Sequence, residues 1–154
     1  MLADDIFRPK LQETIAAVEE WAKRIGPYAQ VERSADGTNW RIRLVPPVDN
    51  ACPCELILRR DQRFDLAIGE ETYEDLPIGS LAVFLPLLQA VVAGNVITRH
   101  WVSSTTGLEY NVETVVSLPD GTTWCGERRN LSAPEPVELN VECKPRHYVP
   151  YYRP

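Results

Sequence analysis

Apolar residues near the start of the chain recur every three or four positions, as in a helix that packs one face on a core. This stripe consists of Leu11, Ile15, Val18, Trp21 and Ile25. Pro9 suits the first helical position because its missing N–H would have no partner there. Gly26 and Pro27 are typical residues for a helix end. We therefore predict an N-terminal amphipathic helix that covers the chain's own sheet.

Much of the remaining chain alternates between apolar and polar residues, which indicates strands with one buried face. Two hairpins are predicted, one over residues 28–45 and one over residues 55–69. Further strands are predicted at 96–103, 108–118 and 122–128, and the second of these has the most regular alternation. Short turns between the strands favour an antiparallel meander.

Residues 80–93 are almost entirely apolar and separate the two groups of strands. Ser80 suits a helix N-cap and Gly94 a helix end, while Pro86 either kinks the helix or delays its start. A strand at 81–85 followed by a short helix is the alternative. A helix that is apolar all round needs cover on several sides, from the sheet, the first helix, the tail or a second subunit. The acidic stretch 70–75 before it is interpreted as a solvated loop.

Together these elements predict an α+β fold with the order αββββαβββ. Both helices lie on one face of a two-layer domain, whose antiparallel sheet has about six to seven strands. The domain spans residues 1–129, and residues 130–154 form an extension rich in proline and tyrosine. In element order alone, the chain is similar to small bacterial binding folds, including secretion-chaperone-like domains.

Length and charge narrow the class of protein. A chain of 154 residues suits one bacterial-type soluble domain that needs neither disulfide nor metal, and no cofactor is expected. Its net charge of −6 argues against general nucleic-acid binding. No apolar run reaches the roughly 20 residues of a membrane span, and the acidic start is unlike a signal peptide. We expect a cytoplasmic protein.

The cysteines are the first candidate site. Only one pair is close in sequence, and a single residue separates its members, whereas structural zinc sites usually show two close pairs. Zinc binding by these four residues, or with His147 replacing one, remains open beside the simpler interpretation of four reduced thiols. The cysteines are Cys52, Cys54, Cys125 and Cys143.

Histidine is scarce, so His100 is the main candidate for general acid–base catalysis if it faces a cleft. Such a cleft would lie between the sheet and residues 80–93, with Tyr110 among its polar groups. The chain has no nucleophile elbow. The alternative is a hydrogen-bonded histidine at the margin of the core.

Arginine greatly outnumbers lysine, and four arginines fall on the outward side of the early strands. A guanidinium is suited to carboxylates and phosphates, so one hypothesis is a site for an anion or an acidic peptide. The alternative is cross-strand pairing with acidic neighbours. These arginines are Arg41, Arg43, Arg59 and Arg63.

The tail combines proline with aromatic residues, a composition found where extended segments bind partners. Packing on its own domain is the alternative. Its candidate contact residues are His147, Tyr148, Tyr151 and Tyr152.

The absence of a catalytic motif, the apolar central segment and the tail together favour a non-enzymatic protein-binding or assembly module. Its partner would be a second copy of the chain, as a homodimer, or another protein. A small-molecule or anion-binding protein or enzyme is the alternative, and a zinc-stabilised domain is the third hypothesis.

Overall fold

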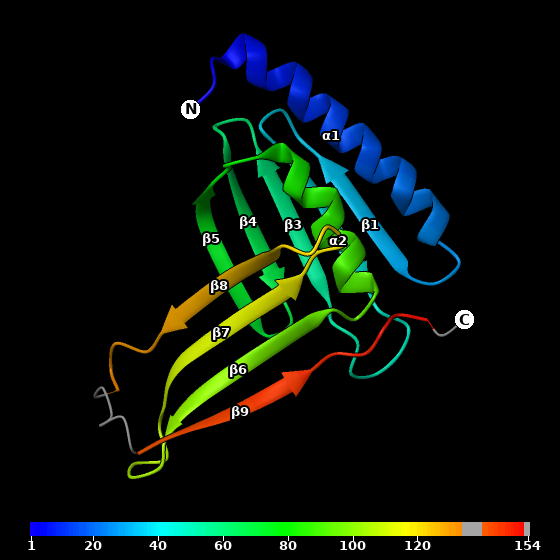
Figure 1. Cartoon of the computed structure of the whole chain (residues 1–154). Coiled ribbons are helices and arrows are strands. Elements are labelled where there is room, and N and C mark those ends of the chain that lie inside the picture. The colour runs from blue at the N-terminus through cyan, green and yellow to red at the C-terminus, as the bar shows by residue number, and fades with distance from the viewer. Residues whose placement is uncertain (134–139, 153–154) are drawn as a thin grey trace.

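The computed structural model describes residues 1–133 and 140–152, which form two helices and two antiparallel sheets (Figure 1). The first sheet contains five strands that are neighbours in chain order. These strands are β1 (Gln30–Ala35), β2 (Asn39–Val45), β3 (Cys54–Arg59), β4 (Arg63–Ile68) and β5 (Glu71–Pro77). Short turns connect them, so each strand pairs with the one before it.

The second sheet has the order β8-β7-β6-β9, so the last strand pairs with β6 at one edge. Its strands are β6 (Val96–Ser103), β7 (Glu109–Ser117), β8 (Thr123–Arg129) and β9 (Val141–His147). A short 3-10 helix, η1 (Leu81–Val83), and the helix α2 (Phe84–Val92) connect the two sheets. In Figure 1 the second sheet extends away from the end of α2.

The first helix, α1 (Asp4–Ile25), buries the predicted stripe, in which Leu11, Val18 and Trp21 are inaccessible or nearly so. It begins five residues before Pro9, earlier than predicted. Two acids in the first turn complement the helix dipole, and Phe7 is buried, which together explain the earlier start. Pro9 therefore lies inside the helix rather than at its first position.

Both helices cover the same face of the first sheet. Trp40 on β2 donates a hydrogen bond to Glu19 of α1 (3.1 Å). Phe64 on β4 packs edge-to-face on Phe84 of α2, with ring centroids 5.0 Å apart. Most of α2 is buried by α1, the first sheet and β7, so the chain itself supplies the cover that this apolar helix needs.

The α+β class, the antiparallel pairing and the two helices are confirmed. The strands, however, form two sheets and number nine among the described residues, where one sheet of six to seven was predicted. The prediction missed β5 because its inward positions include the acid Glu71, which disguises the alternation. It missed β9 because Pro145 argues against a strand, although an edge strand tolerates proline.

Among the described residues, no helix combines the length and the apolar character that crossing a membrane requires.

Candidate functional site

The second sheet buries only one of its faces. Its inner side meets α2 and β5, where the hydroxyls of Tyr73 and Thr114 share a buried hydrogen bond (2.8 Å). The side chains that alternate with these inner residues remain partly exposed. The buried inner residues are Val96, Thr98, Val112, Thr114 and Val116.

The opposite side of this sheet presents a mixed apolar surface. Ile97 and Val115 are directly opposed on β6 and β7, and Trp101 lies opposite Cys143 of β9. Between these rows Arg99 forms an ion pair with Glu113 (3.2 Å). We call this surface the outer patch and define it as Ile97, Trp101, Val115, Cys125 and Cys143.

A network of charged side chains links the first sheet to the second. Glu71 of β5 is only 5% exposed and accepts two hydrogen bonds from Arg128, at 2.7 and 3.1 Å. Arg128 also contacts Glu109 (3.3 Å), which lies 2.8 Å from Nδ1 of His100. Hydrogen bonds to Glu71, and the charges of both carboxylates, raise the pKa of the Arg128 guanidinium. Arg128 therefore stays charged, and its hydrogen bonds to Glu71 and Glu109 join the two sheets.

The contact with Glu109 orients His100, but neither a nucleophile nor one of the clefts against α1 lies beside its ring among the described residues. Its hydrogen bond among the described residues goes to a carboxylate, Glu109, and not to a nucleophile. Clefts of about 520 and 370 Å³ lie against α1, and neither is lined by His100 or Tyr110. Tyr110 instead lines a separate hollow beside Asn130. These contacts and clefts add no support for a catalytic role of His100, which remains a prediction.

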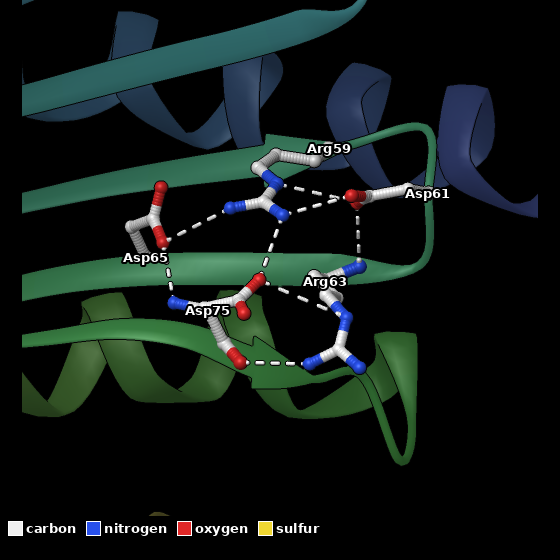
Figure 2. Close-up of polar contacts among 5 residues, drawn as sticks. All are labelled: Arg59, Asp61, Arg63, Asp65 and Asp75. Atoms are coloured by element: carbon white, nitrogen blue, oxygen red, sulfur yellow. Dashed lines mark hydrogen bonds and ion pairs between the residues drawn. The ribbon is translucent and has the colours of Figure 1, made fainter.

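Two of the four predicted anion-binding arginines lie in a network of three aspartates (Figure 2). Arg59 contacts Asp61 and Asp75 at 2.8 Å and Asp65 at 3.5 Å. Arg63 donates to the backbone carbonyl of Asp75 (2.9 Å). The hydrogen bond from Arg59 lowers the pKa of Asp61, so this pair is ionised at neutral pH.

The other two arginines also have acidic partners on the same sheet face. Arg41 pairs with Glu55 (2.9 Å) and Arg43 with Glu32 (3.4 Å). These contacts favour cross-strand pairing as the role of the four arginines. An external anion would have to compete with carboxylates that are already in place.

The four cysteines are unpaired and lie in three different places. Cys54 is buried at the start of β3, with the buried Cys52 just before it, while Cys125 is exposed on β8 and Cys143 is half-buried on β9. Two strands of the second sheet separate Cys125 from Cys143. The described residues contain no group of three side chains that could hold a metal, so the fold does not assemble the proposed zinc site.

Burial should divide these thiols into two classes. It raises the pKa of Cys52 to about 12 and that of Cys54 well above its ordinary value, so neither forms a thiolate readily. At low protein concentration and about pH 8, we expect a disulfide reagent to modify Cys125 and Cys143 quickly in the folded protein. Cys52 and Cys54 should react only after denaturation. Rapid modification of all four in buffer would contradict this burial.

The aromatic tail packs into its own domain. Tyr151 is 1% exposed and donates its hydroxyl hydrogen to the carbonyl of Cys52, while its N–H bonds to Val92 (2.9 Å). Tyr148 is buried as well, and Tyr152 stacks on Tyr28 with centroids 4.4 Å apart. These contacts engage three of the four predicted partner-binding residues within the chain. The fourth, His147, is exposed on β9.

Gly94 permits the close approach of this tail. It has a φ of +81°, and a Cβ at this position would lie 2.6 Å from the backbone nitrogen of Pro150. A single glycine therefore ends α2 and leaves room for the tail to cross it.

Comparison of the chain with protein-family models, curated proteins and solved structures finds no match.

Sequence reasoning did not select the outer patch, although the sequence contained its signal. Residues 96–103 alternate, so Trp101 falls on the face opposite His100. The link between Glu71 and Arg128 had no comparable signal, because 57 positions separate the two residues.

Proposed function

We propose that the protein is a non-enzymatic assembly module that forms a homodimer through the outer patch. One observation carries the proposal: Trp101, Ile97 and Val115 lie partly exposed on a sheet face whose opposite side is already buried. Tryptophan is among the residues that contribute most to protein interfaces when a partner covers it. We also propose that the protein acts in the cytoplasm, where its buried thiols Cys52 and Cys54 remain reduced.

The charges of this face favour a second copy as the partner. Arg99 and Glu113 neutralise each other near its centre, and Glu127 lies beside Arg129 towards one edge. A face of one sign would repel its own copy, whereas a face with balanced charges does not. Two such sheets can pack face to face about 10 Å apart, as in β-sandwiches.

The structure also removes two earlier arguments for self-association. The apolar residues of α2 are covered mainly by the chain itself, and Tyr148 and Tyr151 are buried within it. Neither element offers a large apolar surface to a partner. The proposal therefore depends on the second sheet alone.

Replacing Trp101 with glutamate should weaken dimerisation by at least roughly thirtyfold, because each dimer would bury two unpaired carboxylates. Light scattering over a concentration series measures this change. The unmodified chain should approach twice its 17.4 kDa mass, and the variant should stay near the monomer mass.

Ile57→Glu provides a matched control, since Ile57 is also half-buried on a strand but faces out from the first sheet. This variant should dimerise like the unmodified chain, and circular dichroism should confirm that both variants fold. An unmodified chain that remains monomeric throughout the series would contradict the proposal, as would dimers of equal strength in all three proteins.

A further inference from the structure

A cleft of about 520 Å³ lies between the start of α1 and the segment that leads into η1. Its volume falls within the range of small-molecule sites, roughly 300–1,000 Å³. Apolar side chains form much of the lining, and Gln62 and Ser80 contribute polar atoms. The apolar lining residues include Leu2, Phe7, Ile78, Leu81 and Ala82.

Apart from Lys10, the polar side chains that line this cleft already have partners. The Gln62 amide bonds to both backbone polar groups of Leu2, and the Ser80 hydroxyl accepts the N–H of Ala82 (3.2 Å). Lys10 supplies the only charged side chain among the described residues that line the cleft, and none of these residues is acidic. A ligand would therefore meet the ammonium group of Lys10, the N-terminal ammonium group of Met1, and a wall to which apolar side chains contribute somewhat more than polar atoms.

Exposed apolar side chains occur in the N-terminal segment, where Met1 and Leu2 line the cleft and Ile6 precedes the lining residue Phe7. Met1 is fully exposed, and Leu2 and Ile6 are 44% and 49% exposed. These side chains are open to solvent, and an apolar chain that entered the cleft would cover part of this surface.

We propose that this cleft binds a small amphipathic carboxylate, such as a medium-chain fatty acid, whose head group pairs with Lys10. A peptide fits less well, because the engaged groups of Gln62 and Ser80 leave few partners for its repeated amides. One charged end and a chain without polar groups match the lining. This site is independent of the outer patch, which lies on the second sheet.

Titration calorimetry with hexanoate, octanoate and decanoate, each below its micelle concentration, tests this site. Affinity should rise about fourfold for each methylene that becomes buried. Octanol, which lacks the carboxylate, should bind at least tenfold more weakly than octanoate. Equal affinities for octanoate and octanol, no rise with chain length, or no binding at all would each overturn the proposal.

Lys10→Met retains the apolar stem and removes the charge, and it should reduce octanoate affinity about tenfold. Lys23→Met makes the same change near the other end of α1, outside the cleft, and should leave the affinity unchanged. An equal loss in both variants would show a nonspecific charge effect and would count against the site. Because Trp101→Glu should not alter octanoate binding, the two proposals can fail separately.

Discussion

Replacing Tyr151 with alanine is expected to destabilise the protein by about 3–5 kcal/mol, the usual cost of removing a large buried aromatic side chain. Tyr151 is 1% exposed, and its hydroxyl donates to the carbonyl of Cys52. Burial raises the pKa of this hydroxyl, so it remains a donor at neutral pH. Urea denaturation at one fixed protein concentration measures the change in the free energy of unfolding.

Two further variants separate packing from hydrogen bonding at this position. Tyr151→Phe retains the ring and leaves the Cys52 carbonyl without its partner, so it should cost about 1–2 kcal/mol. Tyr152→Ala removes a neighbouring tyrosine that is 43% exposed and should cost less than about 1 kcal/mol. If Tyr151→Ala were no more destabilising than Tyr152→Ala, the tail would not be part of the core.

Replacing Arg128 with alanine should cost about 2 kcal/mol at neutral pH, because it leaves the carboxylate of Glu71 buried without a cation. This value is below that of a fully buried pair, since the Arg128 side chain is 48% exposed and its charge is partly screened. Arg43→Ala breaks the exposed pair with Glu32 and provides the control, with an expected cost below about 1 kcal/mol.

Adding Glu71→Gln to Arg128→Ala tests whether the buried charge causes this loss. An uncharged amide leaves no buried carboxylate without a cation, so the double variant should regain much of the stability at neutral pH. A deficit of the same size in the double variant would show that Arg128 acts through packing alone.

Local patterns were sufficient to predict much of the fold. The stripe from Leu11 to Ile25 predicted α1, and alternation predicted seven of the nine described strands. These signals are local because residues that face the same side recur at fixed short spacings. Ser80 also indicated the start of the central helical segment, where its side chain accepts the N–H of Ala82.

Features that depend on distant contacts could not be predicted in this way. A strand pattern specifies a buried face but not the sheet to which the strand belongs, so one sheet could not be distinguished from two. Glu71 resembled a solvated acid because its partner Arg128 is 57 positions away. The tail resembled a free extension because Tyr151 meets Cys52 across 99 positions.

The same limit applies to the candidate sites. The four arginines were correctly placed on one sheet face, but the acids that engage them come from other strands. Alternation in residues 96–103 places Trp101 on the face opposite His100, but the complete outer patch forms only when four strands are placed side by side. A surface of this kind is a property of the assembled sheet.

The rate at which a maleimide modifies Cys143 tests the central claim most directly, because this thiol lies beside Trp101 in the outer patch. The rate is measured by mass spectrometry at low and high protein concentration, for the unmodified chain and for Trp101→Glu. Our account predicts that Cys143 of the unmodified chain reacts several-fold more slowly at high concentration, and that Trp101→Glu shows no such protection. A rate in the unmodified chain that does not change with concentration would contradict it.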